Sequence, residues 1–191
     1  LELGLLRTLN QLHLKPRDSD KALKARMSSF ETANGLQAEA PIIMDLSRES
    51  KSTFELYGAT PDDPTSYAAQ VIMARRMIES GVRFVEVIDA VGACRDNWDA
   101  AHRDIASHEK YAKRVDQPAA ALIKDLKQRG LLDDVLIVFC TEFGRTPWAQ
   151  DGKGTKSRAH HPHAFSCWLA GAGIKGGTVY GCLLYTSDAA D

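Results

Sequence analysis

Five of the six histidines in this 191-residue chain lie between positions 102 and 163, close to several carboxylates. Imidazole and carboxylate groups are common protein ligands of divalent metals. Asp99 and His102 are three residues apart, so on a helix they share a face and can converge on one cation. Asp104 and His108 repeat this arrangement at a spacing of four. The alternative is a helix N-terminus that Asp99 caps, with the histidines exposed to solvent.

A second cluster follows an apolar run. Glu142 comes directly after residues 135–141, and Gly144 then permits a tight turn. A carboxylate at the end of a buried strand is well placed to bind a metal. The planar guanidinium of Arg145 offers two parallel donors to a tetrahedral oxyanion. The alternative, equally open from the residues alone, is an ion pair between Glu142 and Arg145 that closes the strand.

A third cluster places three histidines within four residues, at His160, His161 and His163. Neutral imidazole suits zinc, iron or nickel, so any of the three is a candidate ligand. The alternative is a histidine-rich surface loop that binds nothing.

These clusters need elements to position them, and the first 80 residues are predicted to be mainly helical. Apolar residues recur at helical spacing, and the breaks fall at Pro41, at Gly58 as a C-terminal cap, and at Gly81. The expected helices cover residues 3–12, 22–40, 47–58 and 65–80.

From residue 81 onward, β-branched and aromatic runs predict strands. The expected strands cover residues 82–88, 135–141, 165–170 and 178–180, and a helical region interrupted at Pro118 covers 99–129. The apolar run 135–141 suits a central strand that is buried on both faces. A strand, a long helix and a second strand predict a right-handed βαβ unit. The predicted fold class is therefore α/β, a mostly parallel sheet flanked by helices, with ligands at the carboxyl ends of its strands.

Composition argues against several classes of protein. The 24 Lys+Arg and 25 Asp+Glu give a net charge of −1, which speaks against a nucleic-acid-binding protein. No apolar run approaches the ~20 residues that a membrane span requires. The four cysteines form no Cys-x-x-Cys pair, so we expect free thiols packed as small hydrophobic side chains rather than a zinc ribbon.

Taken together, the motifs resemble a known family. Residues 98–102 (WDAAH), 141–147 (TEFGRTP) and 160–177, which begin with HHP, are similar to the sulfatase-like family called domain of unknown function 1501, within the alkaline phosphatase superfamily. The resemblance covers about residues 5–181. It implies an alkaline-phosphatase-like fold, with Asp99, His102 and one of His160 or His161 binding one metal. Glu142 would bind a second metal.

The same resemblance carries expectations about the role of the chain. Residues 1–181 would be the C-terminal part of one sulfatase-like domain, with 1–80 mainly helical and 81–181 carrying the metal motifs. The nucleophile and the first strands would lie in an absent N-terminal part. Residues 182–191 read as a non-native tail. The family often carries export signals, so the resemblance implies a periplasmic or secreted parent protein.

The expected function is that of a fragment of a metal-dependent hydrolase of phosphate or sulfate esters. One or two divalent cations (zinc, calcium, magnesium or manganese) would polarise a small-molecule or polysaccharide ester. Arg145 or Lys175 would stabilise the oxyanion. The alternative is a non-catalytic binding or surface-assembly module that keeps the fold without turnover.

Overall fold

The computed structural model describes residues 2–17, 19–89, 97–153 and 155–181. The chain divides into two compact units, Leu1–Asp45 and Leu46–Asp191. Among the described helices, none combines the length and the apolar character that crossing a bilayer would demand. The expected non-native tail, residues 182–191, lies outside the described residues.

The first unit is helical, as predicted. It consists of α1 (Glu2–Leu14), the short 3-10 helix η1 (Lys15–Arg17) and α2 (Lys21–Met44). The carboxylate of Asp20 caps α2 by accepting from the Leu23 amide at 2.9 Å. The prediction that Pro41 ends this helix is wrong. Pro41 lacks an amide hydrogen, but its carbonyl accepts from the Asp45 amide at 3.1 Å, and one more helical turn forms.

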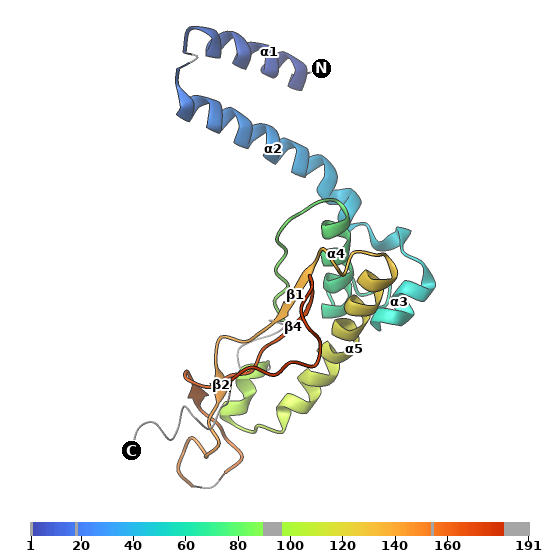
Figure 1. The fold of residues 1–191 in the computed structure, drawn as a ribbon, viewed down its shortest axis with the longest axis vertical. Helices are drawn as coiled ribbons and strands as arrows, with labels where there is room; N and C mark the ends of the chain where they lie inside the picture. The colour runs from blue at the N-terminus through green and yellow to red at the C-terminus, as the bar shows by residue number, and fades with distance from the viewer. Residues whose placement is uncertain (1, 18, 90–96, 154, 182–191) are drawn as a thin grey trace. The chain divides into compact units, whose positions relative to one another are not determined.

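The second unit contains the remaining helices of the described residues (Figure 1). They are η2 (Leu46–Arg48), α3 (Lys51–Tyr57), α4 (Tyr67–Glu79), η4 (Trp98–His102) and α5 (Ser107–Gln128). Ser50 and Ser66 cap α3 and α4, each accepting from the amide three residues further on. Gly58 ends α3 with a φ of 68°, the left-handed conformation that glycine favours. The helix predicted at 65–80 is confirmed as α4, whereas the one predicted at 47–58 is divided between η2 and α3.

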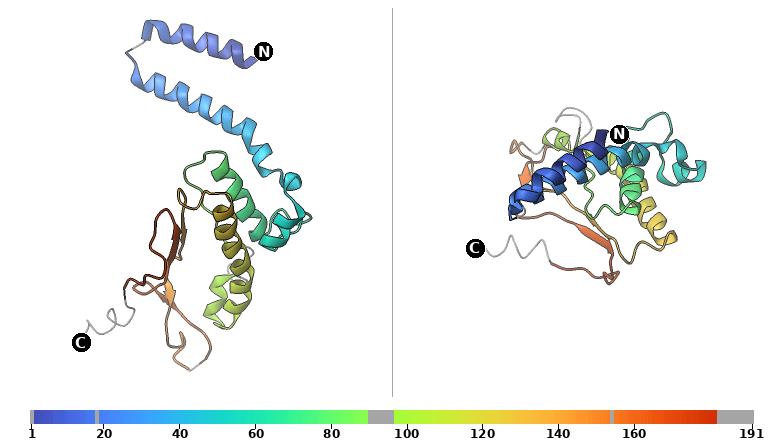
Figure 2. Two further views of the ribbon diagram at one scale, coloured as in Figure 1. Left: turned by 45° about the vertical axis from the view of Figure 1, so that its right-hand side comes forward. Right: turned by 90° about the horizontal axis from the view of Figure 1, so that it is seen from above.

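The core of this unit lies among α3, α4 and α5, which stay side by side in both views of Figure 2. Its largest fully buried side chains are Tyr57, Ile72 and Leu126. The expected interruption at Pro118 does not occur, and α5 runs through it. Pro118 is itself buried, and tertiary packing of this amphipathic helix compensates for one missing backbone hydrogen bond.

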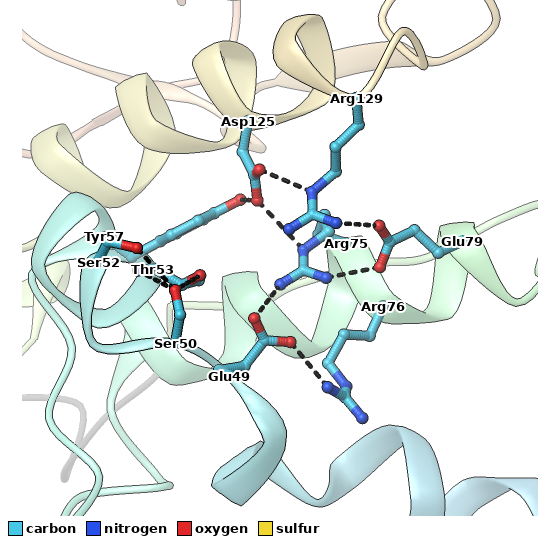
Figure 3. A network of polar contacts seen from close by, with 10 residues as sticks. All are labelled: Glu49, Ser50, Ser52, Thr53, Tyr57, Arg75, Arg76, Glu79, Asp125 and Arg129. Atoms are coloured by element: carbon cyan, nitrogen blue, oxygen red, sulfur yellow. Dashed lines mark hydrogen bonds and ion pairs between the residues drawn. The ribbon is translucent and has the colours of Figure 1, made fainter.

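A buried ionic network joins α4 and the end of α5 to Glu49, which lies between η2 and α3 (Figure 3). Arg75 of α4, only 3% exposed, pairs with Glu49 at 2.7 Å, with Asp125 of α5 at 3.2 Å and with Glu79. Arg129 bonds both Asp125 and Glu79 at 2.7 Å. Three acidic side chains therefore face three arginines: Glu49, Glu79 and Asp125 against Arg75, Arg76 and Arg129. Each buried charge has a partner of opposite sign, as burial requires.

The predicted sheet is wrong. Strand β1 (Leu136–Phe139) pairs antiparallel with β4 (Trp168–Gly171), and β2 (Gly144–Arg145) pairs antiparallel with β3 (His160–His161). Roughly half of the chain is helical, and its described strands form two short antiparallel pairs. The expected alkaline-phosphatase-like α/β fold, with a mostly parallel sheet flanked by helices, is therefore contradicted.

The connection between the strands explains the antiparallel pairing. A parallel pair needs a crossover, usually a helix. In the described part of residues 140–167 there is no helix, and the chain runs out through β2 and returns through β3. It thus meets itself antiparallel, first as β2–β3 and then as β1–β4, like one interrupted hairpin.

The other strand predictions fail for related reasons. Residues 82–88 run without a ladder partner, and Phe84 is 80% exposed. β1 is not buried on both faces, because Leu136 and Val138 are 48% and 53% exposed while their neighbours turn inward. Residues 178–180 form no strand. Of the cysteines, Cys140 and Cys167 are free as predicted but exposed rather than packed, while Cys94 and Cys182 lie outside the described residues.

Candidate metal centre

Two elements of the second unit bring three candidate ligands together. η4 supplies Asp99 and His102, and β3 supplies His160. One ligand atom from each lies within 4.8 Å of the others. Asp99 Oδ1 is 3.1 Å from His102 Nε2 and 3.4 Å from His160 Nε2, and the two imidazole nitrogens are 2.9 Å apart. Two imidazoles and one carboxylate are a donor set that suits zinc.

Local backbone contacts hold η4 against the loop that carries β3. The Asn97 side chain caps η4 by accepting from the Trp98 amide at 2.8 Å. The Arg158 amide donates to the Ala101 carbonyl at 2.8 Å, and the Ile105 amide donates to the Lys156 carbonyl at 2.9 Å. These bonds bring Asp99 and His102 to the start of β3.

The β2–β3 pair sets the second half of the cluster. Arg145 lies opposite His160 in the ladder, and Gly144 lies opposite His161. A Cβ atom at Gly144 would collide with the carbonyl oxygen of Ala164, so the close approach of these two chain segments requires glycine. The glycine that the sequence marks as a tight turn is therefore needed for contact within the site.

Arg145 belongs to the cluster. Its Nη2 atom lies 3.2 Å from Asp99 Oδ1 and donates to the Trp98 carbonyl at 3.2 Å, and its Nη1 atom lies 3.1 Å from His102 Nε2. Burial acts to raise the pKa of Asp99, but hydrogen bonds from Arg145 and His160 outweigh it and lower this pKa below its ordinary value. Asp99 is therefore a carboxylate at neutral pH, the form that binds a cation.

Adjacent residues of a strand point to opposite faces, and this separates His160 from His161. The imidazole of His160 stacks on Phe143, with ring centroids 3.8 Å apart. The ring of His161 instead lies 6.2 Å from Trp148, and its Nδ1 atom is buried without a hydrogen-bond partner. His163 is exposed, with its ring 6.4 Å from that of His161. Of the three histidines, His160 is the one that lies beside Asp99 and His102.

Two further predicted site residues lie apart from this ligand set. Glu142 is exposed and accepts from the Thr141 hydroxyl at 3.2 Å, while Arg145 pairs with Asp99 instead. Lys175 is exposed in the turn after β4. Glu142 is not part of the ligand set found among the described residues.

The pair Asp104 and His108 has a structural role. Asp104 accepts from the Ala106 amide at 2.9 Å, just before α5 begins. His108 donates from Nε2 to the Trp98 carbonyl at 2.7 Å and packs edge-on against the Trp98 ring. The cap of η4 is Asn97, so Asp99 is free of the capping role that the alternative gave it.

Sequence reasoning missed one residue of the site. The Gln150 side-chain oxygen contacts Nδ1 of His102, on the opposite side of the ring from the cluster. A partner on the far nitrogen fixes which nitrogen of a ligating histidine carries the proton. No spacing rule marks Gln150, because it lies in a loop 48 residues from its partner.

The structure thus defines a helical protein with a histidine–carboxylate cluster between a 3-10 helix and a short strand pair. The chain belongs to the family described as "Protein of unknown function (DUF1501)", whose family model matches residues 1–190. This confirms the family to which the sequence motifs pointed. No curated protein and no solved structure matches the chain.

Proposed function

We propose that this chain provides the divalent-cation centre of a hydrolase that acts on phosphate or sulfate esters. The observation that carries the proposal is the convergence of Asp99, His102 and His160, with Arg145 beside them. Hydrolytic zinc sites use three such ligands and leave one position open. The resemblance of the motifs to sulfatase-like proteins of the alkaline phosphatase superfamily supports the ester chemistry.

A divalent cation held by these residues would supply Lewis acidity to the ester oxygens. Asp99 contributes the negative charge that neutralises part of the cation. Gln150 holds the His102 ring with Nε2 turned toward the cluster. Arg145 has the fork geometry to bind two oxygens of a tetrahedral oxyanion. The exposed Lys175 has no described contact with these residues, so we assign the oxyanion role to Arg145.

The proposal is for one cation at this cluster. The sequence motifs placed Glu142 in a second centre, but the single ligand set among the described residues consists of Asp99, His102 and His160. Imidazole-rich sets favour zinc over calcium and magnesium, which prefer oxygen ligands. We therefore choose Zn²⁺ as the probe for the experiment.

The test is a calorimetric titration of the whole chain with Zn²⁺. We expect one Zn²⁺ per chain, and binding at least about 10-fold weaker in Asp99→Asn and in His160→Ala, since each loses one direct ligand. The matched control is His163→Ala, which removes an exposed imidazole from the same loop. Circular dichroism checks that each variant is folded. Equal Zn²⁺ affinity in wild type, Asp99→Asn and His160→Ala would refute the proposed centre.

The exposure of the ligands favours a second candidate, a binding or assembly module without turnover. The side chains of His102, Asp99 and His160 are 30%, 42% and 44% exposed. Hydrolytic sites exclude water to strengthen their electrostatics, and this cluster is open. Zn²⁺ binding with no hydrolysis of p-nitrophenyl phosphate or sulfate by the complete protein would support the module. Hydrolysis that is lost in Asp99→Asn would support the enzyme.

A further inference from the structure

The two ring nitrogens of His102 face different partners, Gln150 at Nδ1 and Arg145 at Nε2. The Gln150 oxygen is an acceptor, so the Nδ1 atom that contacts it donates. Nε2 lies 3.1 Å from Arg145 Nη1 and 3.1 Å from Asp99 Oδ1. Arginine has donors and no acceptor, so its contact is a hydrogen bond in the form of His102 whose Nε2 carries the lone pair. The form with the proton on Nδ1 and the lone pair on Nε2 satisfies both the Gln150 and the Arg145 contact, and it is also the form that binds a cation through Nε2.

Arg145 donates to the same atoms that the proposed centre would use. Its Nη1 donates to His102 Nε2, and its Nη2 lies 3.2 Å from Asp99 Oδ1. A neutral imidazole nitrogen has one lone pair in the ring plane, which serves either a hydrogen bond or a metal bond. Contact of Arg145 with Nε2 and coordination of a cation by Nε2 are therefore mutually exclusive. Two positive charges this close would also repel each other.

We infer that Arg145 competes with the cation for Asp99 and His102, and that cation binding frees its guanidinium to bind an oxyanion. This inference rests on the proposed function, because it describes how the same centre is regulated. Arg145 keeps one anchor outside the ligand set, the Trp98 carbonyl 3.2 Å from Nη2. When the cation takes His102 Nε2, Nη1 loses its acceptor while the guanidinium stays beside the centre.

Binding of the cation and of the oxyanion is consequently cooperative. Without the cation, the donors of Arg145 are taken by Asp99 and His102. With the cation bound, the Arg145 guanidinium lies beside a second positive charge. An oxygen of sulfate or phosphate can then accept from the guanidinium and neutralise part of both positive charges. Coupling of this kind is reciprocal, so the anion also tightens cation binding.

A purely structural ion pair between Arg145 and Asp99 makes a different prediction. Loss of the arginine would then lower stability and loosen η4 against β2, and cation affinity would fall or stay the same. Competition predicts the opposite, a gain in affinity when the arginine is removed.

The experiment measures Zn²⁺ affinity of the whole chain by calorimetry in wild type, Arg145→Gln and Arg145→Met. Methionine preserves most of the side-chain volume, which guards against a failure to fold. We expect both variants to bind Zn²⁺ about 5-fold or more tightly than wild type, the lower end of typical coupling. The control is Arg158→Gln, which removes the same charge from a residue that bonds only backbone carbonyls in the described contacts. Its affinity should stay within about 2-fold of wild type, below the range of typical coupling.

A second readout is inorganic sulfate binding with and without saturating Zn²⁺. Wild type should bind sulfate more tightly with Zn²⁺ present, and Arg145→Gln should show a much smaller gain. Equal or weaker Zn²⁺ affinity in both Arg145 variants would overturn the inference while leaving the proposed centre intact, provided that Asp99→Asn still loses Zn²⁺. Zn²⁺ binding that Asp99→Asn does not weaken would overturn the proposed centre itself, and this inference with it.

Discussion

Tyr57 is fully buried at the end of α3, and its hydroxyl donates to Asp125 Oδ2 at 2.9 Å. Burial raises the pKa of this phenol, and the nearby Asp125 carboxylate raises it further, so the group stays a neutral donor. Tyr57→Phe removes one bond to a buried charge, while Asp125 keeps Arg75 and Arg129. We expect a loss of about 1.5 kcal/mol in the free energy of unfolding.

Urea denaturation followed by circular dichroism measures this loss. Tyr180→Phe is the matched control, because Tyr180 is fully exposed and its hydroxyl is available to water. It should leave the urea midpoint unchanged. A Tyr57→Phe midpoint equal to that of wild type would show that the hydroxyl contributes nothing to holding α3 on α5.

Single residues also show how far the sequence could predict the site. Asp99 and His102 could be predicted from their spacing, because residues three apart share a face in a 3-10 helix such as η4 as well as in an α-helix. The choice between His160 and His161 needed the β2–β3 register, which decides the face that each side chain takes. Gln150 and the pairing of Arg145 with Asp99 depend on loop geometry, on which spacing carries no information.

At the scale of elements, the C-terminus of α3 depends on one glycine and one distant side chain. Gly58 has a φ of 68°, and the Gln117 amide donates to the carbonyls of Glu55 at 3.1 Å and Leu56 at 3.2 Å. A Cβ on Gly58 would lie 2.6 Å from Gln117 Oε1. Gly58→Ala therefore strains the backbone and displaces a side chain that caps the helix. We expect about 2 kcal/mol of destabilisation.

Gly130 provides a matched control for the backbone contribution. Its φ is 71°, and an added Cβ would meet no atom within 4 Å. Gly130→Ala should cost only the left-handed strain, about 1 kcal/mol. The difference between the two variants in thermal or urea denaturation measures the displacement of Gln117. Equal losses would mean that the Gln117 bonds do not stabilise α3.

The elements also show why the fold class could not be predicted from the sequence. Helix ends depend on local signals, and the predicted C-terminal cap at Gly58 is confirmed, since Gly58 ends α3. An apolar run such as 135–141 predicts an extended segment but not its partner. β1 pairs with β4, and the chain between them contains no described helix that could form the crossover of a parallel pair, so the pair is antiparallel. Which strands pair depends on the path of the whole chain, and hydrophobic periodicity within one segment cannot predict it.

At the scale of the whole molecule, stability of the second unit depends on charge balance as well as on apolar packing. Its helices α4 and α5 meet through Arg75, which is bonded to carboxylates from three parts of the chain. A buried guanidinium that loses a partner leaves an uncompensated charge, which typically costs about 3–5 kcal/mol. The network therefore makes the unit sensitive to anything that neutralises its carboxylates, and acid does so.

Glu49 gives this sensitivity a direction. Burial acts to raise its pKa, but hydrogen bonds from Arg76 and Arg75 outweigh burial and hold the pKa below its ordinary value of 4.5. A carboxyl whose pKa is lower in the folded state binds fewer protons there than in the unfolded chain. Its stabilising contribution is thus complete above about pH 4.5 and is lost as the pH falls through the lowered folded pKa.

Glu49→Gln tests this dependence through the slope of stability against pH. The variant should be less stable at neutral pH, because Arg75 and Arg76 lose a charged partner, and its stability should fall less steeply below about pH 4.5. Urea denaturation at a series of pH values measures both effects. Glu109→Gln is the control, since Glu109 forms an exposed pair with Lys113, and it should keep the wild-type slope. An unchanged slope in Glu49→Gln would show that acid destabilises the unit through other carboxylates. It would also mean that the pKa of Glu49 is the same in the folded and the unfolded chain.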